Sequence, residues 1–428
     1  MKQIIHDIKQ RIAAPEKRPL LESFISLSAL NVMNYLFPLI TVPYTVRVLG
    51  VEKFGLINFA QAFIQYFVII TDYGFNLSAT QEIARNRANK EKISHIFSAV
   101  FVIKSVFMIL CCGVMGLVIS YVPKFGSDPL LYIYSFGAVL SSVLFPIWFF
   151  QGMERMRYIT ILNTLFRVLF TLMLFLFVKR PTDYLIVPLL SSLGGIIVGL
   201  ASLYIIFTSF PVVLTKPRLS DIKEELSGGW HIFISQISIS LYSVSNTFIL
   251  GLLTNNTQVG YYAGVEKIIK IVKSLMGSIT QSLFPYINAR VEQSKDAGII
   301  IVRKIIKPLS GAFLLISIGM FIGAPLIIRL ILGSNFEASV PILQAMSFIP
   351  LLVLLSNMMG IQVMLPLNYK RQFSRIIIGA GAVNVLLLFA LIPTFQSRGV
   401  GIAVLITEVS VTVAEYAYLR KKGIALFT

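Results

Sequence analysis

The residues of this chain that could do chemistry are charged side chains placed inside long apolar segments. Glu266, Lys270 and Lys273 are spaced by four and then three residues, which places them on one face of a helix, with Lys267 beside them. If the segment begins near Gly260, Lys270 lies about 15 Å along it, close to the middle of a bilayer core roughly 30 Å thick. Three lysines against one glutamate give this face excess positive charge, which suits an anionic ligand such as a diphosphate.

Three further charges, Lys104, Arg167 and Glu408, occupy similar depths in other apolar segments. A charge in the bilayer interior costs several kcal/mol unless it faces water or a partner. Five cations against two anions therefore predict a water-filled cationic cavity. The alternative is that these charges pair across helices and only hold the bundle together, and it stays open, above all for Lys104 and Arg167. Glu266, Glu408 and Asp72 are candidates for counter-charges or for coupling to H⁺ or Na⁺.

Polar and proline residues of other segments could complete such a cavity. The predicted lining side chains could instead join helices to one another; they are Asn31, Asn34, Gln61, Gln65, Ser238 and Tyr242. Pro38, Pro43 and Pro285 each remove a helix hydrogen bond and favour a kink, so we expect hinges at these positions. The chain has no arrangement typical of a nucleophile with its base, of a phosphate-binding glycine loop or of a metal site, so no catalytic residue, metal or bound cofactor is predicted.

Composition sets the class of protein that positions these residues. Hydrophobic residues make up 56% of the 428 residues, charged residues 13%, and the mean hydropathy is +0.81. Soluble proteins are about 25% charged, so most of this surface must face lipid. The sequence predicts an all-α integral membrane protein with 12 transmembrane helices, at about 22–46, 54–78, 95–120, 130–150, 158–178, 184–207, 230–252, 260–288, 305–330, 339–365, 373–392 and 399–419.

The loops between these segments set the topology. Lys and Arg number 24 in the termini and loops of one side and 7 in those of the other, which places both termini in the cytoplasm of a cell with an inner membrane. Most of the net charge of +18 is explained in this way, as attraction to an anionic leaflet. Because no folded basic surface remains, a nucleic-acid partner is excluded.

The second half of the chain repeats features of the first. Shifting residues 54–85 by 205 positions aligns Gly55 with Gly260 and Gln65 with Lys270, without a gap. The match predicts two six-helix lobes of equal topology around the central cationic cavity. Five regions follow: a cytoplasmic amphipathic segment at 1–20, an N-lobe at 21–207, a cytoplasmic linker at 208–229, a C-lobe at 230–419 and a cytoplasmic tail at 420–428.

Four motifs carry a resemblance to a known family. They read PLITVPYTVRVLG from Pro38 to Gly50, FGLINFA from Phe54 to Ala60, DYGFNLSAT from Asp72 to Thr80, and FPIWFFQG from Phe145 to Gly152. The sequence resembles the Wzx-type flippases of the polysaccharide biosynthesis family. They share a superfamily with lipid II flippases and multidrug/toxin extruders.

The resemblance implies two lobes around a cationic lumen and alternating access. It implies that an undecaprenyl-diphosphate-linked oligosaccharide moves from the inner to the outer leaflet for O-antigen or surface polysaccharide synthesis. A polysaccharide polymerase and a chain-length regulator are the implied partners, besides the lipid bilayer. Lipid II flippases carry arginines low in the first span, where this chain has Asn31 and Asn34, so that role is not transferred.

Three other functions were weighed against a flippase. A drug or cation exporter of the same superfamily should have acidic residues dominating its cavity, whereas this one is cationic. A polysaccharide polymerase or glycosyltransferase should have a large outer loop, whereas the predicted outer loops are about ten residues or shorter. A structural scaffold gives no reason for buried lysines. The prediction is therefore a transporter and not an enzyme.

Overall fold

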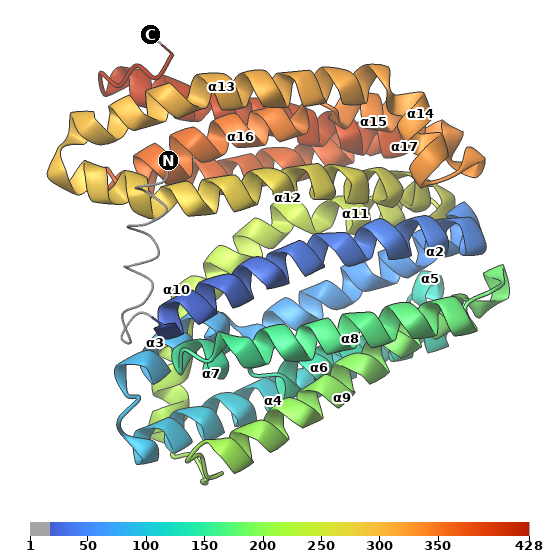
Figure 1. Cartoon of the computed structure of the whole chain (residues 1–428). Coiled ribbons are helices and arrows are strands. Elements are labelled where there is room, and N and C mark those ends of the chain that lie inside the picture. The colour runs from blue at the N-terminus through green and yellow to red at the C-terminus, as the bar shows by residue number, and fades with distance from the viewer. Residues whose placement is uncertain (1–17, 428) are drawn as a thin grey trace. The chain divides into compact units, whose positions relative to one another are not determined.

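The computed structural model describes residues 18–427, except for the side chains of residues 18–36, 241–242, 278, 281–282, 285 and 293. Every regular element in this range is a helix, which confirms the predicted class (Figure 1). Residues 1–17 of the predicted amphipathic segment, and the side chains of Asn31, Asn34, Tyr242 and Pro285, lie outside the described part.

The helices follow one another with short connections. In chain order they are α2 (Arg18–Asp72), α3 (Phe75–Arg85), α4 (Lys90–Tyr121), α5 (Pro123–Gly126), α6 (Pro129–Leu144), α7 (Ile147–Gly152), α8 (Met156–Phe177), η2 (Pro181–Leu185), α9 (Ile186–Ser209), α10 (Leu219–Ser243), α11 (Ser245–Leu253), α12 (Asn256–Gln293), α13 (Lys295–Ile322), α14 (Ala324–Ile331), η3 (Ser334–Ser339), α15 (Val340–Met346), α16 (Ile349–Met359), the π-helical turn η4 (Gly360–Met364) and α17 (Lys370–Lys421).

Helices dominate because a segment in lipid must satisfy its backbone polar groups internally. Within the described residues, eight helical segments are long and apolar enough to cross a membrane, or up to nine if α10 and α11 form one bent span. Two of them, Phe37–Arg85 and Lys370–Lys421, run for 49 and 52 residues and each cover parts of two predicted spans. The chain is thus a multi-pass membrane protein, and the number of twelve crossings stays a prediction.

The longest helices contain breaks at positions other than the predicted hinges. Gly50 in α2 has a φ of 73°, and Gln396 in α17 has a φ of 50°, both outside the helical region. The helix assignment continues through Pro38 and Pro43, so the sharp change of backbone direction falls at Gly50 and not at the two prolines. Glycine suits this position because it has no Cβ to oppose a positive φ.

The chain groups into two compact units. Unit 1 holds the described residues up to Phe37, Phe63–Lys179 and Asp183–Ile237, and unit 2 holds Pro38–Ala62, Arg180–Thr182 and the chain from Ser238 onward. The predicted lobe boundary lies nearby, at 208–229. The structure differs from the predicted lobes in grouping Pro38–Ala62 with unit 2 and residues 230–237 with unit 1.

Each unit has its own apolar core. In unit 1, Phe75, Phe97, Trp148 and Phe149 are all at most 1% exposed and join α3, α4 and α7. In unit 2, the core cluster is formed by α12, α13, α16, η4 and α17, and the fully buried side chains in it include Ile306, Leu354, Met358 and Met364. These cores hold the charged helices described below in fixed positions.

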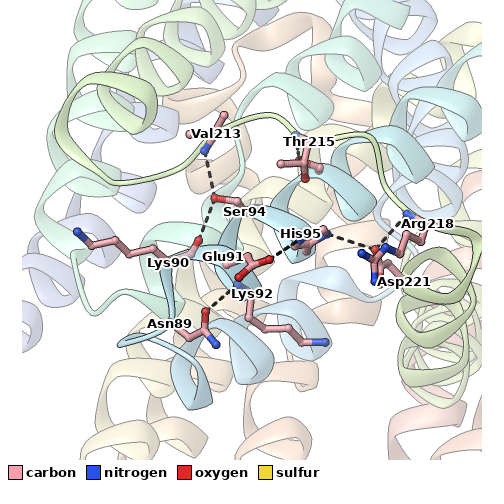
Figure 2. A network of polar contacts seen from close by, with 11 residues as sticks. Asn89, Lys90, Glu91, Lys92, Ser94, His95, Val213, Thr215, Arg218 and Asp221 are labelled. Carbon is pink, nitrogen blue, oxygen red and sulfur yellow. Dashed lines mark hydrogen bonds and ion pairs between the residues drawn. The ribbon is translucent and has the colours of Figure 1, made fainter.

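The segment between α9 and α10 is fastened along α4 by hydrogen bonds (Figure 2). The hydroxyl oxygens of Ser94 and Ser98 accept hydrogen bonds from the backbone N–H groups of Val213 and Thr215, at 3.1 and 2.9 Å. His95 Nδ1 lies 3.4 Å from the carboxylate of Asp221. This is the segment that the sequence analysis placed in the cytoplasmic linker.

Candidate functional site

The candidate site is centred on α12, whose middle turns carry the predicted charged face. Glu266 Oε2 and Lys270 Nζ are 3.0 Å apart, as expected for residues four apart on a helix. The Lys270 side chain is 64% exposed, whereas that of Glu266 is 16% exposed. Lys267 lies on the neighbouring face, with its Nζ 5.5 Å from the centre of the Phe54 ring, where the ring's negative face attracts it. One carboxylate therefore accompanies three lysines within two turns.

Lys273 faces a cavity inside unit 2. The cavity has a volume of about 180 Å³, and its polar lining comprises Lys273, Ser356, Asn357 and Glu408. Glu408 comes from α17 and is only 4% exposed. The structure thus brings together Lys273 and Glu408, two of the predicted site residues, which are 135 positions apart in the sequence. Most of the other lining side chains are apolar, so the two charged groups share a largely apolar cavity.

A fully buried carboxyl group lies next to this cavity. Glu415 is 0% exposed, and neither of its carboxyl oxygens meets hydrogen-bond geometry with a described residue, although Ser356 lies beside it. A Cβ on Gly360 would lie 2.5 Å from Glu415 Oε1 and 2.5 Å from a ring carbon of Phe373, so a larger residue there would have to displace one or both side chains. Gly360 begins the π-helical turn η4, a distortion that often marks functional sites. Glu415 was not among the predicted site residues, because its burial depends on how the helices pack.

Unit 2 also contains a buried network of hydrogen-bonded polar side chains that the sequence analysis did not predict. Asn384 Nδ2 donates to Asn246 Oδ1 at 2.9 Å, and Thr407 Oγ1 donates to Asn384 Oδ1 at 3.2 Å. Asn384 and Thr407 are 0% exposed and Asn246 is 4% exposed. The bonds join α11 to the two halves of α17. The polar residues within apolar segments were the available signal, but nothing in their spacing indicates that they meet.

Lys104 of unit 1 has a different environment from the α12 lysines. Its Nζ lies 2.7 Å from Asp72 Oδ1 and donates to the carbonyl oxygen of Ser142 at 2.6 Å. The side chain is 3% exposed. Lys104 therefore does not face an open cavity, and the alternative of pairing across helices describes it. Asp72 serves as its counter-charge and also accepts a weak hydrogen bond from Asn76.

Arg167 of α8, also in unit 1, is half-buried. Its Nε is buried and has no hydrogen-bond partner among the described residues. A guanidinium carries five donors and always retains its charge, so an unpaired buried N–H is costly. The group is therefore suited to an anionic ligand that supplies acceptors.

The other predicted lining residues that the structure describes are exposed or half-buried. Gln61 and Gln65 are exposed and lie one turn apart on α2, while Ser238 of α10 is half-buried. The roles predicted for Asn31, Asn34 and Tyr242 concern side chains outside the described part. Within the described residues, no group of His, Cys, Asp or Glu side chains is arranged to hold a metal ion.

Two helix starts that the 205-residue shift aligns cross at close range within unit 2. A Cβ on Gly55 would lie 1.8 Å from the carbonyl oxygen of Asn256, and a Cβ on Gly260 would lie 2.2 Å from that of Val51. Val51 and Asn256 are themselves 205 positions apart, so each glycine faces the carbonyl group related to that of the other. The aligned glycines thus share one function, which is to let two backbones touch.

The chain was compared with known proteins. Residues 20–289 match the family of polysaccharide biosynthesis proteins. Over 408 residues, which are 94% of this chain and 97% of the relative, it is 35% identical to a protein of Escherichia coli (strain K12) named "Putative O-antigen transporter".

Solved structures share the fold. An inward-facing multidrug resistance MATE family transporter of the MOP superfamily matches with a TM-score of 0.67 at 15% identity, over 94% of this chain and 98% of that chain. The lipid II flippase MurJ, in an inward closed conformation, matches with a TM-score of 0.66 at 13% identity, over 94% and 87%. At these identities the likeness concerns the fold alone.

Proposed function

The chain belongs to the polysaccharide biosynthesis protein family, and we propose that it is a flippase for undecaprenyl-diphosphate-linked oligosaccharide units. It carries them by alternating access from the cytoplasmic to the outer leaflet of the inner membrane. The units then serve the synthesis of O-antigen or another surface polysaccharide. The observation that carries this proposal is the charge of α12, which places Lys267, Lys270 and Lys273 beside the single carboxylate of Glu266.

The excess charge on α12 requires a compensating partner. α12 has 38 residues and is about 57 Å long, more than enough to cross a bilayer. Each unbalanced cation at mid-depth costs about 3 kcal/mol or more in lipid. A diphosphate supplies several negative oxygens and offsets that cost when it binds. The substrate is therefore attracted to α12 more strongly than a neutral or cationic molecule would be.

The other charged residues divide into two groups under this proposal. Arg167, whose buried Nε has no partner among the described residues, contributes a second donor group to the substrate. Glu266, Glu408 and Asp72 act as counter-charges, since Glu266 pairs with Lys270 and Asp72 with Lys104. Lys104, which is buried and paired, keeps a structural role. We keep H⁺ or Na⁺ as the coupling ion, without assigning it a residue.

The cellular setting completes the proposal. The protein lies in the inner membrane with both termini in the cytoplasm, and twelve spans form two lobes around the lumen. A polysaccharide polymerase and a chain-length regulator act on its product. The relative's name, "Putative O-antigen transporter", supports the part of this proposal that concerns O-antigen.

The test uses a host strain whose surface polysaccharide depends on this protein. Lys270→Ala and Lys273→Ala should each abolish or strongly reduce surface polysaccharide, with wild-type amounts of protein in the membrane. Lys53→Ala, on the predicted outer loop, is the matched control and should leave polysaccharide normal. Normal polysaccharide in both test variants would contradict the proposed role, and resistance to cationic drugs conferred by the wild type would favour an exporter instead.

A further inference from the structure

A second pocket lies in unit 1. It is an open hollow of about 650 Å³ beside the first three turns of α10, where the chain between α2 and α3 approaches that helix. Its lining includes Tyr73, Ile222, Lys223, Leu226, Trp230 and His231. The five residues from α10 are spaced by one, three or four positions, so they form one stripe along the helix. None of the predicted site residues belongs to it.

The stripe contains Lys223 but none of the acidic residues of α10. The acidic residues of α10 are Asp221, Glu224 and Glu225, and none of them lines the pocket. Glu224 Oε2 lies 3.3 Å from Lys92 Nζ, and Glu225 is only 5% exposed. Asp221 approaches His95 (Figure 2), and the backbone N–H of Arg218, 3.0 Å from its carboxylate, lowers the pKa of this carboxyl below its ordinary value.

Within the described part of the chain, Lys223 and His231 have no ion-pair partner, and no carboxylate lines the pocket with them. Both side chains are exposed. A lysine and an imidazole that share a pocket without a carboxylate favour an anion with several oxygen acceptors. Lys223 therefore lies beside the apolar wall of Ile222 and Leu226, and His231 lies about two turns further along α10, next to Trp230.

Aromatic rings form the third side of the pocket. The ring of Tyr73 stacks on that of Phe233 with centres 4.6 Å apart. The ring centre of Trp230 lies 6.1 Å from that of Phe233. Trp230 is 48% exposed and lines the pocket. Tyr73 has a φ of 44°, which is unusual for a bulky residue and is held by the packing of α10 against Tyr73 and Gly74.

We propose that this pocket is a loading site for the carrier lipid, which binds the diphosphate and first sugar before the substrate reaches α12. Lys223 and His231 bind the diphosphate oxygens, the exposed face of Trp230 stacks against the sugar, and the isoprenoid chain follows Ile222 and Leu226. A tryptophan at a membrane interface can also act only as an anchor. The lack of acidic side chains in the pocket lining and the volume beside the ring distinguish a site from an anchor. The inference rests on the proposed function, because that function names the lipid.

Trp230 itself reports on binding. The purified full-length protein is placed in nanodiscs of phosphatidylcholine, and undecaprenyl-diphosphate-linked N-acetylglucosamine is added while tryptophan emission is recorded. We expect a saturable change that is lost in Trp230→Phe, since the other tryptophan, Trp148, is only 1% exposed. Lys223→Ala combined with His231→Ala should raise the apparent Kd at least about tenfold, because a cation and a second hydrogen-bond donor that contact the headgroup are removed. Lys216→Ala, an exposed lysine of the same linker outside the pocket, should bind like the wild type.

Two results would overturn the inference. One is an equal emission change with phosphatidylglycerol, which would make the pocket a general anionic-lipid site. The other is unchanged affinity in the Lys223 and His231 double variant. Failure of the proposed function is distinguishable: Lys270→Ala with Lys273→Ala should keep the Trp230 response and lose translocation in liposomes. A wild-type protein that does not translocate the lipid at all would instead contradict the function itself.

Discussion

Lys104 and Lys270 have similar predicted depths in the membrane, but their environments in the structure differ in burial and in charge balance. Lys104 in unit 1 is 3% exposed, 2.7 Å from Asp72, and donates to a backbone carbonyl. Lys270 in unit 2 is 64% exposed and shares one glutamate with two further lysines nearby. Lys104 is therefore neutralised by a carboxylate of unit 1, whereas the three lysines of α12 outnumber the one glutamate within the same two turns. Depth alone therefore does not distinguish these two lysines, and we propose local charge balance as the property that marks a substrate-binding cation.

The largest effect that this comparison predicts is on folding. Lys104→Ala leaves Asp72 as an unpaired charge in a nearly buried position, which should lower the free energy of unfolding by about 3–5 kcal/mol. The thermal midpoint of the purified protein and its amount in the membrane measure this loss. Lys104→Met with Asp72→Leu removes both charges and should recover most of the stability. If Lys104→Ala is as stable as the wild type and loses only transport, Lys104 binds substrate and the comparison is wrong.

The next effect is on transport through α12. Lys273→Ala should slow translocation at least about tenfold, which corresponds to ~1.4 kcal/mol, because a cation that attracts the diphosphate is removed. Its thermal midpoint should change little, since Lys273 is half-buried and lies at an open cavity. Lys273→Arg, which keeps the charge, is the matched variant and should retain most of the rate. A loss of stability as large as that of Lys104→Ala would place Lys273 among the structural charges.

The smallest effect concerns the ion pair on α12. A pair of this kind, four residues apart with one exposed partner, contributes only about 0.3–0.5 kcal/mol to stability. Glu266→Gln should therefore hardly change the thermal midpoint, while it frees Lys270 and strengthens binding of the anionic substrate severalfold. Equilibrium binding of the diphosphate-linked sugar to the purified variant measures this. Weaker binding would show that Glu266 itself contacts the substrate.

The sequence could predict the helices and the regions where the two longest ones bend, but not the residues at which they bend. Long apolar runs make helices obligatory in lipid, and each predicted span falls on helix. The sharp bends at Gly50 and Gln396 fall between predicted spans, in the gaps at 47–53 and 393–398, although neither residue was predicted as a hinge. The hinges in this part of the chain were predicted at Pro38 and Pro43, through which α2 continues. A proline weakens a helix locally, whereas a positive φ changes the direction of the chain.

The site was predictable only where its residues share one helix. The face of α12 follows from spacing alone, as the Glu266–Lys270 pair confirms. Contacts between helices, such as Lys104 with Asp72 or Lys273 with the cavity that Glu408 lines, depend on how the helices rotate, and a single sequence does not determine that. The pocket beside Trp230 is a similar case, since it requires Tyr73 to approach α10 from a distant segment.

The most direct test of the α12 charge is translocation in a defined bilayer. Wild-type protein is reconstituted into liposomes that carry a fluorescent undecaprenyl-diphosphate-linked saccharide, and the fraction that becomes accessible to a quencher on the opposite side is followed with time. The account predicts translocation by the wild type and a rate at least about tenfold lower for Lys270→Ala with Lys273→Ala at equal amounts of reconstituted protein. Equal rates for the two proteins would contradict it.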